Sequence, residues 1–165
     1  MSNIRIGSGI DVHRFSNTPG SDNTIVLGGV PIPHDYSILA HSDGDVLIHA
    51  LIDAILGALA LGDIGRHFPD TDERYKDISS LLLLSEVTRM MAEQGWSLVN
   101  ADITLVAEAP RLSPYIDLIR GSLAQALEVT PAEISVKATT SEGLGFTGRR
   151  EGIAAYASVL LQKAS

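Results

Sequence analysis

Two short stretches of the sequence hold histidine and aspartate at spacings that suit metal binding. In Asp11-Val-His13 the ionisable residues are two apart, so on a strand both side chains point to the same face. The stretch HSDGDVLIH, from His41 to His49, places two histidines and two aspartates just before an apolar run typical of a helix. Asp11, His13 and His49 would supply two nitrogens and one oxygen, a suitable zinc ligand set with a fourth position open. Spacing alone therefore indicates a candidate metal site, with ordinary solvated residues as the competing interpretation.

Helix capping offers a structural explanation for part of the second stretch. Ser42 and Asp45 have the spacing of a capping box, which predicts Ser42 as the N-cap of the following helix. Asp45 and His49 are four residues apart and share one helical face, so Asp45 is also expected to orient the His49 imidazole. Capping accounts for the serine and the aspartates but leaves both histidines unexplained.

Composition limits the class of protein. With 165 residues, 45% of them hydrophobic, we expect one domain over residues 1–165 with a full core. The lack of cysteine excludes disulfides and thiolate zinc sites, so a metal would need histidine and carboxylate ligands. A net charge of −8 argues against nonspecific nucleic-acid binding. No stretch reaches the roughly 18 apolar residues of a membrane span, and a strand follows the first methionine too closely for a signal peptide. We therefore expect a cytoplasmic protein without a nucleic-acid or membrane partner.

The hydrophobic pattern predicts the elements that must position these residues. Gly28-Gly29 between short β-branched runs predicts a hairpin. Alternation predicts four strands, at 3–14, about 98–107, 134–140 and 153–162, the last of which also fits a helix. Helical spacing predicts three helices, at 43–61 with Gly62 as its C-cap, about 78–94 and about 112–128. The expected class is α/β (α+β), with a mixed four-stranded sheet covered by helices on one face and a small hairpin.

Five motifs together resemble one enzyme family. The chain contains, in this order, DVH, HSDGD-x₃-H, DIG-x-x-FPDTD, KATT-x-E and GFTGR. Each motif is weak alone, but the ordered set spans nearly the whole chain, from about Ile4 to Lys163. In this combination the chain closely resembles the 2-C-methyl-D-erythritol 2,4-cyclodiphosphate synthases of non-mevalonate isoprenoid biosynthesis.

The resemblance implies a lyase reaction. In this family the 2-phosphate of 4-diphosphocytidyl-2-C-methyl-D-erythritol 2-phosphate attacks the β-phosphorus, CMP leaves, and a cyclic diphosphate forms. Nucleophile and electrophile both belong to the substrate, which agrees with the lack of a serine or cysteine nucleophile signature here. The resemblance also implies a Zn²⁺ ion in the catalytic site and a Mg²⁺ or Mn²⁺ ion at the substrate diphosphate. It further implies a homotrimer with active sites at subunit interfaces. Its setting would be the bacterial cytoplasm.

The resemblance assigns roles to single residues. Asp11, His13 and His49 match zinc ligands, His41 and Thr140 match residues that stabilise the transition state, and Glu142 matches a ligand of the second metal ion. Residues 63–72 match the part that holds methylerythritol, and residues 107–113 match the loop that reads cytosine. The implied substrate contacts are Asp11, His13, His41, Ser42, Asp63, Ile64, Gly65, Phe68, Pro69, Asp70, Thr71, Asp72, Ala107, Glu108, Ala109, Pro110, Arg111, Leu112, Ser113, Thr139, Thr140, Ser141, Glu142, Phe146 and Arg149.

Two other functions stay open at the level of sequence. The same three metal ligands would suit a phosphohydrolase that activates water. A non-catalytic module that binds nucleotides or isoprenoid phosphates is the second alternative.

Overall fold

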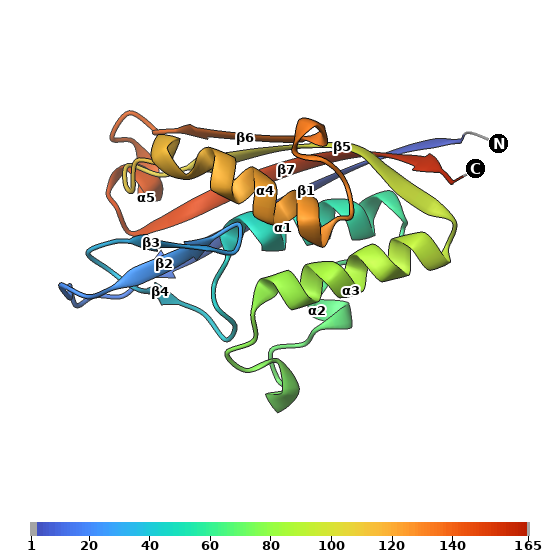
Figure 1. Cartoon of the computed structure of the whole chain (residues 1–165). Helices are drawn as coiled ribbons and strands as arrows, with labels where there is room; N and C mark the ends of the chain where they lie inside the picture. Colours follow the sequence, from blue (N-terminus) through green and yellow to red (C-terminus); the bar gives the residue numbers. More distant parts are fainter. Residues whose placement is uncertain (1–2, 165) are drawn as a thin grey trace.

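The computed structural model describes residues 3–164, in which a five-stranded sheet and a two-stranded hairpin pack with helices (Figure 1). The sheet has the strand order β4-β1-β7-β5-β6. Its strands are β1 (Ile4–Phe15), β4 (Ile38–Leu39), β5 (Trp96–Val106), β6 (Ile134–Thr139) and β7 (Gly152–Lys163). The hairpin strands are β2 (Thr24–Leu27) and β3 (Val30–Pro33). The α-helices are α1 (Val46–Ala58), α2 (Ile64–His67), α3 (Ser80–Glu93), α4 (Ile116–Ala126) and α5 (Gly145–Gly148).

The predicted α/β class and hairpin are confirmed, but the predicted four-stranded sheet is wrong by one strand. The additional strand is β4, which pairs antiparallel with the end of β1 through Arg14–Leu39 and Phe15–Ile38. Two residues are too few to produce an alternating pattern, so this strand left no signal in the sequence. The sheet is mixed because β5 and β6 run parallel whereas the other pairs are antiparallel.

Helix α1 lies at the centre of the molecule, between the sheet and α3 (Figure 1). Almost every residue of α1 is buried, so the helix is covered by other elements on nearly all sides. It approaches β1 very closely, because a Cβ at Gly7 would lie 1.9 Å from the Ala54 carbonyl oxygen and one at Gly9 would lie 2.0 Å from that of Ala50. Only glycine at these two positions allows the two backbones to touch.

The start of α1 differs from the prediction. The helix begins at Val46 rather than at residue 43, and its N-cap is Asp45, whose side chain accepts a hydrogen bond from the Ile48 N–H. The prediction that Ser42 is the N-cap is therefore wrong. Gly44 explains the later start, because its φ of +71° is left-handed and interrupts the helix at that point. The C-cap is Leu59 rather than Gly62.

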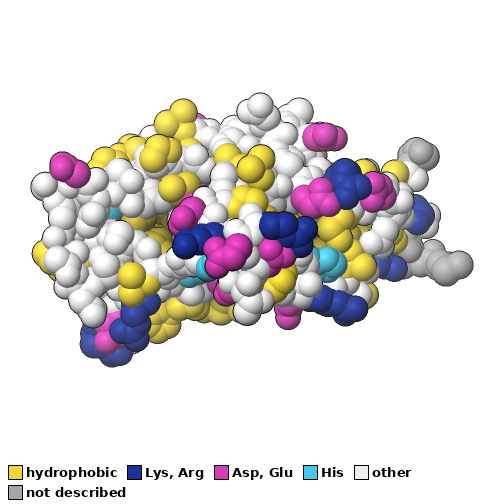
Figure 2. Space-filling view, turned by 90° about the horizontal axis from the view of Figure 1, so that it is seen from below, with side chains coloured by type: hydrophobic (Ala, Val, Ile, Leu, Met, Phe, Trp, Pro, Cys, Tyr) yellow, Lys and Arg dark blue, Asp and Glu magenta, His cyan; other side chains and the backbone are white. Residues whose placement is uncertain are grey.

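The two faces of the sheet have different surroundings. Helices α1, α3 and α4 lie on one side of it (Figure 1). On that helical side Lys and Arg side chains lie beside Asp and Glu side chains (Figure 2), as in the ion pairs that Arg89 makes with Glu86 and Glu93. On the other face β1 and β7 expose large apolar side chains, namely Ile4, Ile6, Ile10, Val12 and Tyr156. Within residues 3–164, no helix has the length and apolar character needed to cross a membrane.

Candidate functional site

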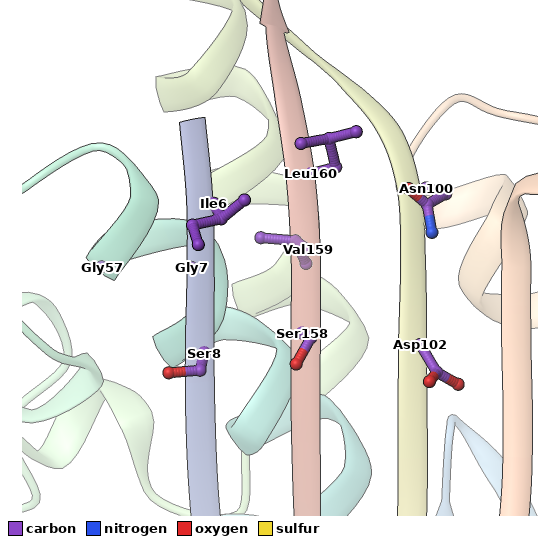
Figure 3. A pocket seen from close by; sticks show the side chains of 9 residues that line it. All are labelled: Ile6, Gly7, Ser8, Gly57, Asn100, Asp102, Ser158, Val159 and Leu160. Atoms are coloured by element: carbon purple, nitrogen blue, oxygen red, sulfur yellow. The ribbon is translucent and has the colours of Figure 1, made fainter. Parts of the chain in front are cut away.

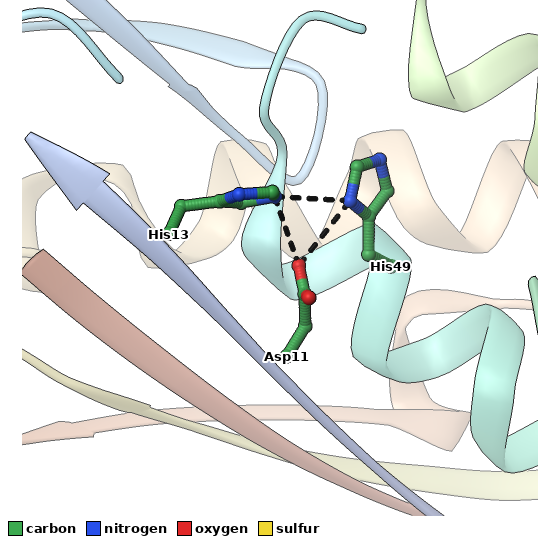
Figure 4. A group of neighbouring side chains, drawn as sticks. All are labelled: Asp11, His13 and His49. Atoms are coloured by element: carbon green, nitrogen blue, oxygen red, sulfur yellow. Dashed lines mark hydrogen bonds and ion pairs between the residues drawn. The ribbon is translucent and has the colours of Figure 1, made fainter. Parts of the chain in front are cut away.

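Asp11, His13 and His49 meet at a single point, as the spacing predicted (Figure 4). Asp11 and His13 project from the same face of β1, and His49 projects from the first turn of α1. The Asp11 Oδ2 atom lies 3.0 Å from His13 Nε2 and 3.2 Å from His49 Nδ1, and the two nitrogens are 3.1 Å apart. The three side chains are only 11–25% exposed.

The donor set and its spacing fit a zinc ion. Tetrahedral zinc with ligand distances of about 2.0–2.1 Å places neighbouring ligand atoms about 3.3 Å apart, close to the separations in this triad. Two imidazole nitrogens and one carboxylate oxygen are also a common ligand set of catalytic zinc, which keeps its fourth position free for substrate. The residues present therefore suit the metal that the resemblance implies.

The electrostatics of the triad also favour a cation. Burial acts to raise the pKa of Asp11, but its hydrogen bonds to His13 and His49 outweigh burial and lower the pKa from 3.8 to about 2. Burial acts to lower the pKa of His49, but the hydrogen bond and charge of Asp11 raise it above 6.5. Asp11 is thus held as a carboxylate that stabilises positive charge beside it.

A cavity of about 290 Å³ opens beside the triad. His41 and Ser42 line it, and so do parts of the segment that follows α1. The Nε2 atom of His41 is buried and has no hydrogen-bond partner within residues 3–164, which is unusual for a buried polar atom. The predicted site residues that line this cavity are Asp11, His13, His41, Ser42, His49, Ile64, Gly65, Phe68 and Asp70.

Four predicted contacts of the 63–72 segment lie outside the lining of this cavity. Asp63 caps α2 and accepts a hydrogen bond from the Arg66 N–H at 3.0 Å. Asp72 forms an ion pair with Arg74, at 2.6 Å. Pro69 and Thr71 lie in the same turn and are also absent from the lining. The segment is held to α1 by Asp53, whose Oδ1 accepts a hydrogen bond from the Ile64 N–H at 2.7 Å.

The remaining predicted site residues form a second group, at the ends of β5 and β6. The Ala107 N–H donates to the Thr139 carbonyl at 3.0 Å, and Glu108 Oε1 accepts from the Ser141 N–H at 3.1 Å. A third bond, from the Gly143 N–H to Glu108 Oε1 at 3.4 Å, completes the link between the two loops. These bonds hold the two loops together.

Most of this second group is open to solvent. Thr140 and Glu142 are exposed, and Glu142 has a left-handed φ of +54°. Within the loops Arg111 donates to Ser113, Leu112 is buried, and the Ala109–Pro110 peptide bond is cis. Phe146 lies on α5 and Arg149 pairs with Glu151 at 3.0 Å. In the described part of the chain, none of these residues lines the cavity beside the triad.

Asp45 does not orient His49, contrary to the prediction. Its carboxylate accepts hydrogen bonds from Gly28 N–H at 2.9 Å, Gly29 N–H at 2.7 Å and Ile48 N–H at 3.2 Å. It therefore ties the hairpin turn to the start of α1. Burial raises the pKa of Asp45 to about 6, despite the lowering effect of these bonds. The nearer of the two hydroxyls on the far side of the His49 ring belongs to Ser80, at 2.8 Å, which sequence reasoning missed.

Comparisons with known proteins agree with the motifs. The model of the YgbB family matches residues 4–162. A 2-C-methyl-D-erythritol 2,4-cyclodiphosphate synthase of Vibrio vulnificus (strain CMCP6) is 55% identical over 160 residues, which are 97% of this chain and 99% of the relative. The enzyme of that name from Pseudomonas aeruginosa (strain UCBPP-PA14) is 57% identical over 158 residues, 96% of this chain and 98% of the relative.

Solved structures extend the agreement to the fold. IspF of Plasmodium falciparum in a CDP complex is 33% identical, with a TM-score of 0.86 over 100% of both chains. The bifunctional IspDF of Campylobacter jejuni is 44% identical, with a TM-score of 0.89 over 97% of this chain and 42% of that chain. The resemblance inferred from the motifs is thus confirmed. The chain belongs to the YgbB family, the family of the 2-C-methyl-D-erythritol 2,4-cyclodiphosphate synthases.

Proposed function

We propose that the chain is a lyase that converts 4-diphosphocytidyl-2-C-methyl-D-erythritol 2-phosphate to 2-C-methyl-D-erythritol 2,4-cyclodiphosphate. An oxygen of the 2-phosphate forms a bond to the β-phosphorus, and the bond from that phosphorus to the oxygen shared with the CMP phosphate breaks. CMP leaves with that oxygen and its electron pair. The reaction is an intramolecular phosphoryl transfer, so the protein has to fold the substrate and stabilise charge rather than supply a nucleophile.

The observation that carries this proposal is the convergence of Asp11, His13 and His49 beside a cavity lined by His41 and Ser42. These three residues would hold Zn²⁺, which when bound offsets phosphate charge and acts as a Lewis acid. His41 lines the same cavity and has an unpartnered ring nitrogen, so we assign it to a phosphate oxygen, where it would stabilise the charge that develops in the reaction. Local groups of this kind allow a chain with a net charge of −8 to bind a polyanion.

We assign the cytidine diphosphate end of the substrate to the second group of residues. The loop 107–113 would bind cytosine, Thr139 and Thr140 the diphosphate, and Glu142 a Mg²⁺ or Mn²⁺ ion. This assignment is supported by the family's motifs and by the link between the two loops through Glu108. An exposed carboxylate at a turn is accessible to a hard cation that already carries phosphate ligands.

We further propose that the chain works as a homotrimer whose active sites lie between subunits. One argument is that the two groups of site residues do not share a cavity within the described chain. Another is the row of exposed isoleucine, valine and tyrosine side chains on β1 and β7, because apolar faces of this kind mark protein interfaces. A cavity of about 540 Å³ lies over β1, β7 and β5 and is bordered by Ile6, Ser158 and Asp102 among others (Figure 3).

The activity is tested by incubating the purified protein with the cytidine diphosphate substrate, Zn²⁺ and Mg²⁺. We expect CMP and the cyclic diphosphate in equal amounts, without incorporation of oxygen from ¹⁸O-labelled water. A linear product that carries the label would instead identify a phosphohydrolase. Cytidine nucleotide binding without turnover or zinc would identify a binding module.

The assembly is tested by sedimentation equilibrium of the wild-type chain and of Ile6→Asp. We expect a trimer for the wild type and a shift toward monomer for the variant, since a charge on the apolar face opposes its burial. Leu82→Asp places the same charge at an exposed apolar side chain of α3, on the helical side of the sheet and away from the apolar row, and it serves as the control. A monomeric wild type would contradict this proposal.

A further inference from the structure

The two ring nitrogens of His49 face different surroundings. Nδ1 points to the triad, 3.2 Å from Asp11 Oδ2 and 3.1 Å from His13 Nε2. Nε2 points away from it and lies 2.8 Å from Ser80 Oγ. A histidine binds a metal through an unprotonated nitrogen, and the hydrogen bond of its other nitrogen decides which one is free. Binding through Nδ1 therefore requires the proton to reside on Nε2.

Ser80 is itself bound to a carboxylate, in a way that settles the direction of its hydrogen bonds. Its hydroxyl lies 2.5 Å from Asp43 Oδ1, and its backbone N–H donates to Asp43 Oδ2 at 2.9 Å. A carboxylate oxygen only accepts hydrogen bonds, and a hydroxyl has a single proton to donate. Since that proton goes to Asp43, Ser80 Oγ faces His49 as an acceptor. The ring nitrogen opposite must then carry the proton.

This chain of contacts is built into the core. Ser80 is fully buried at the first position of α3, and Asp43 Oδ1 also accepts from the Asp45 N–H at 3.2 Å. Ser42 is the other hydroxyl near His49 Nε2, but it lies at 3.3 Å and its oxygen is shared with the Gly44 N–H. The shorter and more buried contact is the one to Ser80.

We propose that Ser80, held by Asp43, is a positioning residue that keeps the His49 proton on Nε2 and so presents Nδ1 to the metal. The contact links the start of α3 to the metal ligand on α1, and it also fixes the rotation of the imidazole ring. The inference rests on the metal binding proposed above, and it adds two residues, Ser80 and Asp43, that are not themselves ligands. Groups that orient a ligand in this way change metal affinity about 10–100-fold when they are removed.

Ser80→Ala tests the inference, with Ser79→Ala as a matched control. Ser79 is the adjacent, exposed N-cap of α3 and makes no side-chain capping bond, so its removal changes the same helix end without touching His49. Zinc affinity is measured by competition with a chelator. We expect Ser80→Ala to bind zinc about 10–100-fold more weakly and Ser79→Ala to match the wild type.

A second measurement separates positioning from packing. In ¹H–¹⁵N spectra of the zinc-loaded proteins, we expect the His49 Nε2–H to exchange slowly with water in the wild type and in Ser79→Ala. In Ser80→Ala the proton loses its acceptor, so its exchange is expected to quicken. Unchanged zinc affinity in Ser80→Ala would overturn the inference. Weaker affinity with unaltered Nε2–H exchange would overturn it too, because Ser80 would then act by packing alone. A wild-type chain that bound no zinc would instead refute the metal site itself.

Discussion

The metal half of the proposed site, formed by Asp11, His13, His49 and the lining of their cavity, is constructed differently from the nucleotide half, formed by residues 107–113 and 139–149. The metal half stands on β1 and α1, whose backbones touch in the core, and its ligand atoms already lie 3.0–3.2 Å apart. The nucleotide half consists of loops that bond mainly to each other, with Thr140 and Glu142 exposed. A single chain thus preorganises the metal half, whereas the proposed nucleotide half is largely exposed to solvent.

The largest expected effect is the loss of zinc and activity in a variant of the metal half, compared with loss of activity alone in a variant of the nucleotide half. His49→Ala removes one of three ligands, so we expect zinc to be lost and kcat/KM to fall about 10³-fold, which corresponds to about 4 kcal/mol. Glu142→Ala should lose activity while its zinc content stays at the wild-type level. Metal analysis and CMP release measure both. A His49→Ala chain that failed to fold, as judged by circular dichroism, would indicate a structural metal instead.

Mixing these two variants tests whether the halves meet between subunits. If each active site takes its halves from different copies, co-refolding equal amounts of His49→Ala and Glu142→Ala creates some sites with both halves intact. Random assembly makes about one site in four complete, so CMP release should recover to about a quarter of the wild-type rate. Each variant refolded alone is the control. No recovery on mixing would mean that one chain supplies both halves.

The contribution of Asp45, which links α1 to the hairpin, to the stability of the folded chain is expected to depend on pH. Because burial raises its pKa from 3.8 to about 6, the folded state takes up a proton that the unfolded state does not. The resulting stability is fully present below pH 3.8 and is lost as the pH rises through about 6. The loss amounts to about 3 kcal/mol.

Urea unfolding of the metal-free wild type and Asp45→Asn at pH values of about 4 and 7.5 measures this contribution. The asparagine side chain of the variant does not titrate, so we expect the difference in unfolding free energy between the two proteins to change by about 2 kcal/mol over that range. A difference that stayed constant with pH would contradict the prediction.

The smallest expected effect concerns the nucleotide half. Glu108→Ala removes the acceptor for the Ser141 and Gly143 N–H groups, so the loops lose their mutual link. We expect KM to rise about tenfold, equivalent to about 1.4 kcal/mol, with zinc affinity unchanged. Steady-state kinetics and chelator competition test both expectations. A loss of zinc would show that the halves are coupled within one chain.

Features encoded by neighbouring residues were predictable from the sequence. The hairpin turn was predicted from Gly28-Gly29, and both residues have the positive φ that such turns require, +60° and +77°. The first residue of α1 was harder to predict from the sequence, because Ser42, Asp43 and Asp45 can all act as N-caps. The deciding contacts of Asp45 go to the hairpin, which is distant in sequence. For the same reason β4 was missed, since its two residues gain their structure only from pairing with β1.

The candidate site divides in the same way. Asp11 and His13 were recognisable because their spacing on a strand places them on one face, and His49 followed as a helical histidine. Ser80 is 31 residues from His49 and has no distinguishing pattern, so only the fold reveals its contact. The separation of the two halves is also a property of the folded chain. Motifs that a resemblance assigns to one site can therefore lie apart in a single folded chain.

The two glycines of β1 have a consequence for how this protein can evolve. Gly7 and Gly9 let the backbone of β1 contact the backbone of α1 directly. The same strand holds Asp11 and His13, and the same helix holds His49. The distance between the strand and the helix is therefore set by main-chain atoms and not by the size of the leucines and isoleucines around them. Substitutions among those apolar side chains can accumulate without changing the spacing of the three ligand atoms. The geometry of the metal ligands is therefore expected to tolerate substitutions in the apolar core, whereas Gly7 and Gly9 themselves can hardly be replaced.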